Sequence, residues 1–435
     1  MSGVAGPAGR GAAGLTARDW RGGWRDGLSY GALGLPLAFV ALPLYVVLPN
    51  HYASVFGVPL ALLGAVLLGA RLLDAFADPL IGRWADALLA RSAQRAGWVA
   101  ALAAGVLVVG FRGLFFPPVQ GTAALLGWCA ALLAVTYLSY SVVTVVHQAW
   151  GARRGGVEPQ RARIVAWREG LALAGVLVAS VLPSVAGLSI TTGVFAAALA
   201  GGVALLLCAP RPRPSAPGAE PVAMGLPFSS PAFRRLLLVY LVNGIASAIP
   251  ATLVLFFIRD RLQATGFEPL FLVGYFAAGA LSIPLWLRGV GRFGLARTWL
   301  LGMGLAVLVF IWAATLGAGD TVAYTAVCVL SGVALGADLT LPGALLAGVI
   351  QRAGHGNHAE GAYFGWWNFA TKLNLALAAG VALPALQAFG YAPGSRSPQA
   401  LQALTIAYCV LPCALKLAAA ALLYTQWIRT AESSP

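Results

Sequence analysis

Residues 121–147 read GTAALLGWCAALLAVTYLSYSVVTVVH, an apolar stretch that no Asp, Glu, Lys or Arg interrupts. A helix needs about 20 apolar residues to cross the hydrocarbon core of a bilayer. Comparable stretches recur along all 435 residues, and 60% of the chain is hydrophobic while 10% is charged. A soluble domain typically carries about 25% charged residues. The sequence therefore predicts an all-α protein that crosses a membrane many times.

The apolar stretches fall into two sets, separated by a proline-rich segment. Residues 209–218 read APRPRPSAPG, and these prolines exclude a helix. We expect twelve spanning helices, near 27–49, 58–82, 97–116, 121–147, 164–186 and 189–208, then near 234–258, 268–288, 295–317, 320–350, 361–388 and 401–427. The predicted domains are an N-terminal segment 1–26, a six-helix bundle 27–208, a linker 209–233, a second six-helix bundle 234–428 and a tail 429–435.

The positions of arginine predict the orientation of these helices. The net charge is +14, and most arginines lie between alternate spans, whereas the other loops hold only Arg112, Arg259, Arg261 and Arg396. Cytoplasmic loops are enriched in Lys and Arg, so we expect both termini and the linker in the cytoplasm and the chain in the plasma (inner) membrane. No basic stretch is long enough to follow phosphates, which argues against nucleic acid. The expected partners are the lipid bilayer and a small-molecule substrate, and the expected state is a monomer.

A few ionisable residues lie within the predicted spans. An ionisable side chain at the centre of a spanning helix costs about 2.5–3.5 kcal/mol on insertion scales, so each of these residues is a candidate for function. The residues are Arg71, Asp74, Asp78, Arg168, Glu169, Asp338, Lys372 and Lys416.

Asp74 and Asp78 are four residues apart and share one face of their helix. Two carboxylates this close in a low dielectric repel each other, and a shared cation or one proton relieves the repulsion. The pair is therefore predicted to bind a coupling ion, Na⁺ or H⁺. The alternative is a structural pair that Arg71 and a neighbouring helix neutralise.

The other charged residues within the spans have different expected partners. Glu169 points about 100° away from Arg168 on the helix, so we do not expect these two to pair. Arg168 is expected either to pair with Asp74 or Asp78 across helices or to contact substrate. Lys372 is one of only two lysines in the chain, and its ammonium is expected beside the cation site or on substrate. Lys416, the other lysine, is expected to extend toward the cytoplasmic surface.

Aromatic and amide side chains gather at two helix ends. His147, Gln148 and Trp150 end the fourth span, and Trp366, Trp367 and Asn368 begin the eleventh. An aromatic face with hydrogen-bonding amides suits a polyol or a sugar ring. The alternative is a belt of aromatic side chains at the membrane interface.

Residues 70–86, ARLLDAFADPLIGRWAD, carry a recognisable motif. They resemble the signature of the glycoside-pentoside-hexuronide:cation symporter family. Residues 28–31 (LSYG), 148–150 (QAW) and 167–168 (WR), together with Lys372, support the resemblance, which extends over most of the chain. It implies the major facilitator fold, two six-helix halves that expose a central site alternately to the two sides of the membrane.

The resemblance also implies roles for individual residues. Asp74, Asp78 and Lys372 match the cation site of the family, Arg168 matches an arginine of the sugar pocket, and Trp150 matches a tryptophan that stacks on sugar. The predicted substrate residues are Arg168, Trp150, His147, Gln148, Asp338 and Asn368. Within the motif, gating or structural roles are assigned to Arg71, Pro79, Gly82, Arg83 and Asp86.

The sequence departs from the family at two positions. Residues 34–38 read GLPLA, without the acid that the family uses for sugar on its first helix, and Val146 and His147 stand where the family has an acid on its fourth helix. Ion coupling is therefore better supported than sugar binding.

The leading hypothesis is a cation-coupled symporter of a glycoside, sugar or related small organic solute, with no cofactor and no metal beyond the coupling ion. The alternative is a proton-coupled exporter of a non-sugar compound or a lysolipid-type amphiphile with the same fold. An enzyme is not expected, because no nucleophile or metal cluster stands at a predicted membrane face, and a non-transporting sensor is a further alternative.

Overall fold

The computed structural model describes residues 23–212, 222–391 and 394–429. Much of the predicted segment 1–26, the middle of the predicted linker 209–233 and nearly all of the predicted tail 429–435 lie outside these residues. Within them, the regular secondary structure is helical, as the composition predicts. Helices satisfy every internal backbone hydrogen bond within one segment, which a span in lipid requires.

The first half of the chain forms six spans. The first span is built from α1 (Trp24–Gly31), α2 (Gly34–Leu42), η1 (Pro43–Val47) and α3 (Leu48–Ser54). The next three are α4 (Leu60–Arg91), α5 (Ala93–Phe115) and α6 (Thr122–Ala152). The long helix α7 (Glu158–Cys208) is broken at Gly187, where φ is 75°, and so supplies two spans. The break lies between the two helices predicted at 164–186 and 189–208.

The second half follows the same plan. After the short helix α8 (Leu226–Ser229) come α9 (Pro231–Phe256), which continues as η2 (Phe257–Arg261), and α10 (Glu268–Ala313), which breaks at Gly294 with φ 78°. Then come α11 (Thr321–Arg352) and α12 (Glu360–Ala388). The last span joins α13 (Pro398–Thr405), η3 (Ile406–Val410), α14 (Leu411–Leu423) and η4 (Tyr424–Ile428). With α7 and α10 each counted as two, the described residues form twelve long helical spans.

Some helices are longer than their apolar runs. α4 was expected to end near residue 82 but continues to Arg91, and α6 continues to Ala152. Residues 83–91 of α4 (RWADALLAR) contain neither glycine nor proline and are mostly strong helix formers, so the helix continues past the apolar run. These extensions matter because they place polar side chains at one end of the bundle.

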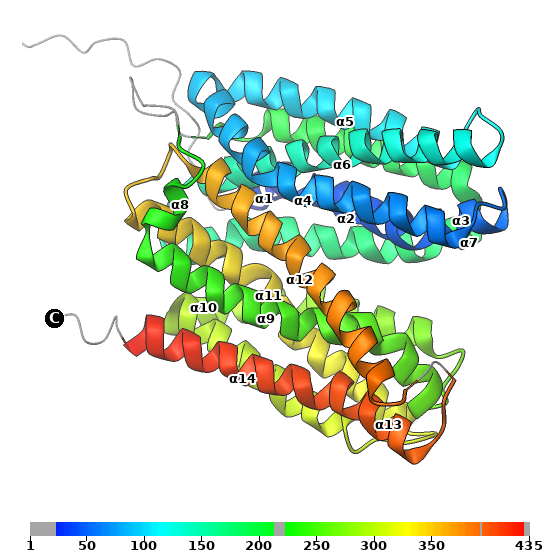
Figure 1. Ribbon diagram of the computed structural model, residues 1–435. Helices are drawn as coiled ribbons and strands as arrows, with labels where there is room; N and C mark the ends of the chain where they lie inside the picture. Colours follow the sequence, from blue (N-terminus) through cyan, green and yellow to red (C-terminus); the bar gives the residue numbers. More distant parts are fainter. Residues whose placement is uncertain (1–22, 213–221, 392–393, 430–435) are drawn as a thin grey trace, which may run out of the picture.

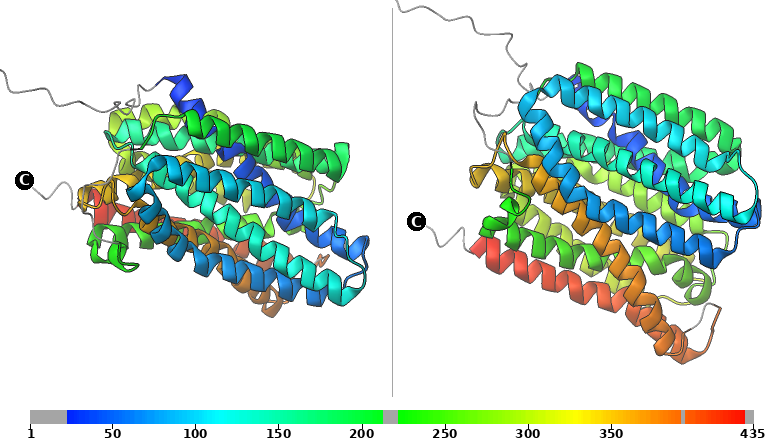
Figure 2. Two further views of the ribbon diagram at one scale, coloured as in Figure 1. Left: turned by 90° about the horizontal axis from the view of Figure 1, so that it is seen from above. Right: turned by 45° about the horizontal axis from the view of Figure 1, so that its top comes forward.

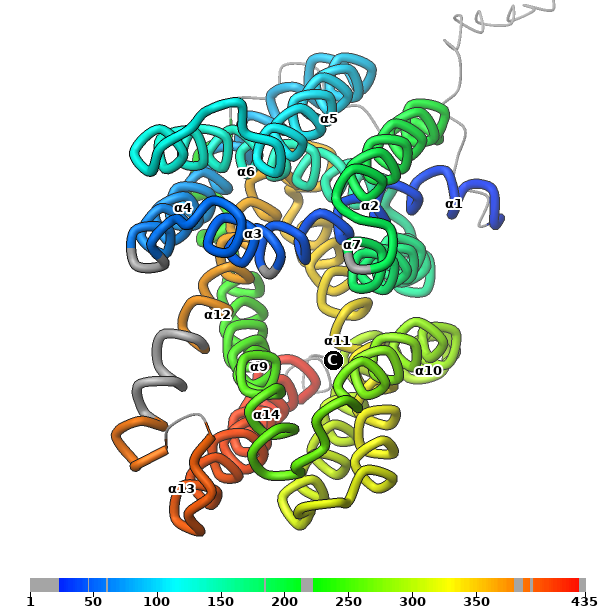
Figure 3. Tube along the Cα trace, turned by 90° about the vertical axis from the view of Figure 1, so that its right-hand side faces the viewer, coloured from blue at the N-terminus to red at the C-terminus, as the bar shows by residue number. Residues whose placement is uncertain are grey.

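Three buried apolar clusters form the core. The helices from α1 to α7 pack around the first, and the other two lie among the helices from α9 to α14. One of these two also includes Ala152 of α6 and Ala162 and Val165 of α7, so it joins the halves. Figure 3 shows the helices of the first half grouped above those of the second, with α11 and α12 reaching between them. The right-hand view of Figure 2 shows the same separation from another side.

α1, α8 and the end of the chain that follows α14 lie at one end of the molecule, here called the terminal end (Figure 1). Helix α12 begins at this end beside α4 and runs diagonally until it reaches α13 at the far side of the second half (Figure 1). The two halves are therefore joined closely by α4 and α12 at the terminal end.

Candidate cation and substrate site

A cavity of about 400 Å³ lies between the two halves. The first half contributes side chains from α2, η1, α6 and α7, and the second contributes side chains from α9, α11 and α12. The predicted residues that line it are His147, Gln148, Arg168, Asp338, Asn368 and Lys372. The fold thus brings six of the predicted cation and substrate residues to one central space.

Lys372 of α12 joins the two acids of α4 at the wall of this cavity. Its Nζ lies 2.7 Å from Oδ2 of Asp74 and 2.7 Å from Oδ2 of Asp78. Nζ also donates to Ser141 Oγ at 3.0 Å, and that hydroxyl donates to Asp74 Oδ1 at 2.7 Å. Asp74 is 3% exposed and Asp78 is fully buried. Four side chains from three helices therefore form one compact polar cluster.

The charges of this cluster do not balance. Two carboxylates face one ammonium, which leaves one negative charge in a buried place where charge is costly. Oδ1 of Asp78 has no hydrogen-bond partner among the described residues. Arg71 does not supply the missing charge, because its guanidinium lies over the Tyr45 ring, 4.1 Å from the centroid. A monovalent cation or a proton would neutralise the cluster.

Arg168 and Glu169 correct our expectation that they do not pair. Nε and Nη2 of Arg168 lie 2.9 Å and 2.6 Å from Oε1 of Glu169. The 100° offset describes where each Cβ points, whereas these long side chains bend toward the cavity and meet beyond the helix surface. Arg168 forms this pair in place of the predicted one with Asp74 or Asp78.

Aromatic and amide groups line the same cavity. Trp367 stacks on Tyr240 with ring centroids 3.7 Å apart and planes inclined by 21°. Nδ2 of Asn368 donates to Oε1 of Gln148 at 2.9 Å, so one hydrogen bond joins the two halves across the cavity. His147 also lines the cavity, and its Nε2 lies 2.8 Å from the backbone oxygen of Tyr30.

Trp150 lies elsewhere. It is 2% exposed, its indole Nε1 donates to the carbonyl of Pro210 at 3.2 Å, and it is absent from the cavity wall. Its ring packs within α5, α6 and the end of α7, near Gly97. The predicted stacking of Trp150 on substrate therefore has no geometric basis in this arrangement. Trp367 and Tyr240 supply the aromatic surface instead.

Lys416 also differs from its prediction. We expected it to extend toward the cytoplasmic surface, but it is 7% exposed and its Nζ lies 2.6 Å from Oδ2 of Asp338. Asp338 Oδ1 accepts hydrogen bonds from Trp299 Nε1 at 2.9 Å and Asn243 Nδ2 at 3.2 Å. The sequence identified Asp338 as a candidate but gave no sign of this partner, because α11 and α14 meet only through the fold.

Asp86 links the two halves at the terminal end. Its carboxylate accepts hydrogen bonds from the backbone N–H groups of Gly361 at 2.8 Å and Ala362 at 2.7 Å, in the first turn of α12. Nη2 of Arg153 lies 3.0 Å from Asp86, and Nε of Arg153 lies 3.0 Å from Glu360. An anion at a helix N-terminus is stabilised by the helix dipole. Asp86 therefore holds α12 against α4.

The neighbouring motif residues shape the same contact. A Cβ on Gly82 would overlap the carbonyl oxygen of Gly361, so only glycine allows α4 and α12 to cross this closely. Pro79 lies within α4, and its Cα would be 2.9 Å from a Cβ added to Gly365. Arg83 is exposed.

Comparison with known proteins identifies the family of this chain. Residues 29–429 match the model of a family described as MFS/sugar transport protein. The chain belongs to this family. The membership predicted from residues 70–86 is thereby confirmed, and a member of the MFS/sugar transport family is a multi-pass membrane transporter of small molecules, not an enzyme.

One relative is similar in sequence over a limited region. The inner membrane symporter YicJ of Escherichia coli (strain K12) is 31% identical over 133 residues, which make up 30% of this chain and 28% of that protein. The match thus spans less than a third of either protein.

Solved transporter structures share the fold along nearly the whole chain. A bacterial homologue of the iron transporter ferroportin has a TM-score of 0.70 at 16% identity and covers 93% of this chain and 99% of its own. The human organic anion transporter MFSD10 has a TM-score of 0.63 at 17% identity, with 92% and 99% covered. The nucleoside transporter NupG has a TM-score of 0.58 at 15% identity, with 91% and 99% covered. These likenesses confirm the predicted major facilitator fold.

Proposed function

We propose that this transporter is a symporter that couples uptake of a small polar organic solute, of the sugar or glycoside class, to Na⁺ or H⁺. The observation that carries the proposal is the cluster of Asp74, Asp78 and Lys372. It holds one excess negative charge, lies at the wall of the central cavity and joins both halves. A site with these three properties links the binding of a cation to the relative position of the halves.

The cation and Lys372 compete for the same oxygens. When a Na⁺ ion or a proton reaches Asp74 and Asp78, the carboxylates no longer need the ammonium, and Lys372 is released toward the cavity. Lys372 is 22% exposed at its side chain, so it has room to turn. Because Lys372 belongs to α12 and the acids belong to α4, its release loosens one tie between the halves.

The cavity offers the contacts that a polar solute needs. Tyr240 and Trp367 form an aromatic surface, and Gln148 and Asn368 present amides to the same space. Arg168 and Glu169 already neutralise each other, so a neutral solute does not have to compensate for a buried charge there. On α2 the wall is apolar, formed by Gly34, Leu37, Ala38 and Ala41. This wall favours a solute with one apolar face, and it supports a lysolipid-type amphiphile as the second candidate.

The contacts of Asp86 support an alternating-access cycle. We infer that the terminal end is cytoplasmic, since Arg83, Arg153 and Arg161 lie there, and that the described conformation is closed on this side. Opening requires α12 to leave Asp86 and the close crossing at Gly82. The cavity and the cluster of Asp74, Asp78 and Lys372 lie within one chain, so a monomer suffices for transport, and we place it in the inner membrane.

The substrate and the coupling ion can be tested together. We expect one member of a panel of neutral sugars, glycosides, organic acids and lysolipids to raise the melting temperature of the purified protein, and to raise it more in NaCl than in choline chloride. A ligand present at about 100 times its Kd stabilises the folded state by about 2.7 kcal/mol. If Na⁺ or pH alone shifts the melting temperature and no sugar or glycoside does, the carbohydrate class is wrong. If the solute effect is the same in both salts and at every pH, the coupling is wrong.

A further inference from the structure

A buried pair of opposite charges lies wholly within the second half. Lys416 Nζ is 2.6 Å from Asp338 Oδ2 and 3.2 Å from Ser247 Oγ. The chemistry parallels that of Asp74, Lys372 and Ser141, with a carboxylate, an ammonium and a hydroxyl. The charges here balance, however, since one acid faces one base. The cation cluster does not explain this pair, because it shares no residue with that cluster.

Asp338 stands between two cavities. It lines the central cavity of about 400 Å³ and also a separate cavity of about 70 Å³ within the second half. Lys416 lines only the smaller one. The side chain of Asp338 is 13% exposed and that of Lys416 is 9% exposed. A proton that enters the central cavity can therefore reach Asp338, whereas Lys416 faces the smaller cavity within the second half.

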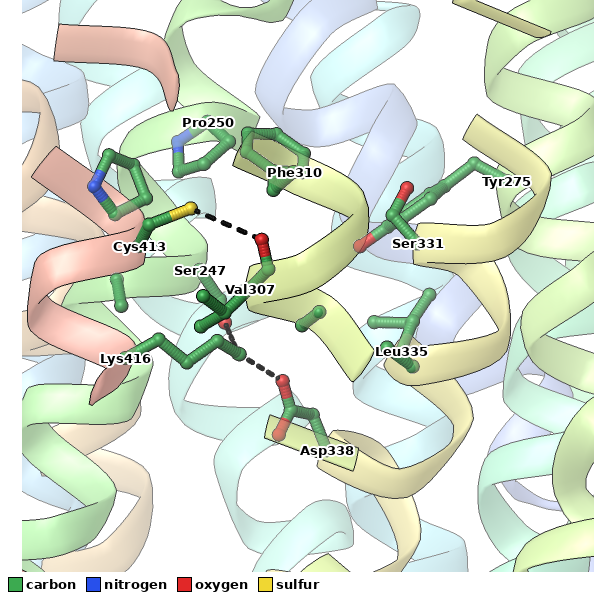
Figure 4. A pocket seen from close by; sticks show the side chains of 14 residues that line it. Ser247, Pro250, Tyr275, Val307, Phe310, Ser331, Leu335, Asp338, Cys413 and Lys416 are labelled. Atoms are coloured by element: carbon green, nitrogen blue, oxygen red, sulfur yellow. Dashed lines mark hydrogen bonds and ion pairs between the residues drawn. The ribbon is translucent and has the colours of Figure 1, made fainter. Parts of the chain in front are cut away.

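The smaller cavity offers Lys416 an alternative position. Figure 4 shows its ammonium between Asp338 and Ser247, with Ser331 and Tyr275 across the pocket. Ser331 Oγ donates to the carbonyl of Val327 at 2.6 Å and keeps its lone pairs free to accept. The hydroxyl of Tyr275 forms no hydrogen bond with any residue that the structure describes. A volume of about 70 Å³ holds about two water molecules, at about 30 Å³ for each in the liquid.

The carboxylate itself stays in place without Lys416. Trp299 Nε1 and Asn243 Nδ2 both donate to Oδ1, which leaves Oδ2 to the ammonium alone. Exchange of the partner at Oδ2 therefore does not require Asp338 to change its other contacts.

We propose that Asp338 is a second cation-binding site of this transporter and that its ligand is a proton. The proton adds to Oδ2 of the Asp338 carboxylate and gives a neutral carboxylic acid. Lys416 keeps its own proton and positive charge, loses its ion pair, and turns toward Ser331 and Tyr275 while it retains Ser247. The pair changes from a net charge of zero to a net charge of +1. No bond other than the new O–H bond is formed.

The surroundings favour a proton over a metal cation. The ammonium of Lys416 occupies the position from which Na⁺ would approach Oδ2. The other partners of Asp338, Trp299 and Asn243, are neutral hydrogen-bond donors and cannot serve as the second carboxylate that the first cation site has. The charged and titratable groups that line the two cavities with Asp338 are Lys416 and Cys413 of α14, Tyr275 of α10 and Tyr240 of α9. Across the central cavity lie Tyr45, Tyr140, His147, Arg168, Glu169 and Lys372. Arg168 and Glu169 cancel, so the electrostatic balance at Asp338 is set chiefly by Lys416.

Charge movement after a pH jump tests this proposal without any solute. The protein is reconstituted in proteoliposomes on a solid-supported membrane, and the external pH is lowered in Na⁺-free buffer. The double variant Asp74→Asn with Asp78→Asn removes the first cation site. We expect this variant to retain a transient current, and we expect addition of Asp338→Asn to remove most of the displaced charge, because the carboxylate that takes up the proton is then absent.

Two results would overturn the proposal: no current in the double variant, or an unchanged current after addition of Asp338→Asn. If Asp338→Asn does not accumulate because Lys416 is left unpaired, the neutral pair Asp338→Asn with Lys416→Gln replaces it, with the same expected loss. The control is Glu268→Gln, which removes a half-buried carboxylate that pairs with the exposed Arg259 and lines neither cavity, and it should leave the current unchanged. This inference rests on the proposed function only in that it assumes a transport cycle coupled to a cation. If this proposal fails, the proposed role of Asp74 and Asp78 in ion coupling still stands, because the double variant tests the second site alone.

Discussion

Replacement of Asp78 by asparagine is expected to abolish concentrative uptake. In this variant Lys372 neutralises Asp74 alone, and the cluster no longer carries the excess negative charge that attracts a cation. Without a bound ion, the ion gradient no longer drives the solute, so the internal solute concentration should rise to the external concentration and no further. The measurement is uptake into proteoliposomes, driven by an inward Na⁺ or H⁺ gradient, of the solute that the melting panel identifies.

Asp74→Asn should behave like Asp78→Asn, because Lys372 contacts both carboxylates at 2.7 Å. Glu268→Gln is again the matched control, since Glu268 lies in an exposed ion pair that contributes little. Exchange of solute at equal concentrations on both sides should persist in the two aspartate variants, because exchange needs no driving ion. Full accumulation in both variants would mean that these acids do not couple transport to an ion.

Replacement of Gly82 by alanine is expected to open the terminal end. The new Cβ would overlap the carbonyl oxygen of Gly361, and backbone atoms on both sides leave little freedom to move. Overpacking of this kind costs typically about 1–3 kcal/mol, and every 1.4 kcal/mol changes an equilibrium about tenfold. The closed conformation bears this cost, whereas a conformation in which α4 and α12 have separated does not.

A cysteine at Ala347 reports this opening. Ala347 is 4% exposed in the described conformation and lines a small pocket near Gln148 and Arg161. With the five native cysteines replaced by serine, alkylation of Ala347→Cys should be about tenfold faster or more in the Gly82→Ala background. Gly64→Ala provides the control, since no atom lies within 4 Å of its added Cβ. Equal rates in the two backgrounds would show that the Gly82 crossing does not hold the terminal end closed.

The sequence predicts best those features that depend on spacing along one helix. Asp74 and Asp78 share a face because they are four residues apart, and their common cluster in the structure follows from that. Lys372 was identified because lysine is rare in this chain, and the fold places it between those two acids. The helix breaks lie at Gly187 and Gly294, between helices predicted from separate apolar runs.

Features that depend on long side chains or on contacts between distant helices were missed. The angular rule for Arg168 and Glu169 is correct for the first atoms of each side chain and fails at their ends. Lys416 was expected at a membrane surface because its partner Asp338 belongs to another helix, 78 residues earlier in the chain. Trp150 matches a family motif, yet its indole donates to Pro210 and stays away from the cavity. None of these outcomes could be read from spacing along one helix.

If Asp74 and Asp78 bind the coupling ion, the melting temperature of the solute-free protein depends on that ion and on these two carboxylates. The melting temperatures of the natural protein and Asp78→Asn are compared in NaCl and choline chloride at one ionic strength, at neutral and at mildly acidic pH. We expect Na⁺ or acid to stabilise the natural protein by a few degrees, and we expect Asp78→Asn to lose most of the response to the same ion. If Asp78→Asn keeps the full response of the natural protein to both Na⁺ and acid, the cation does not bind at this cluster.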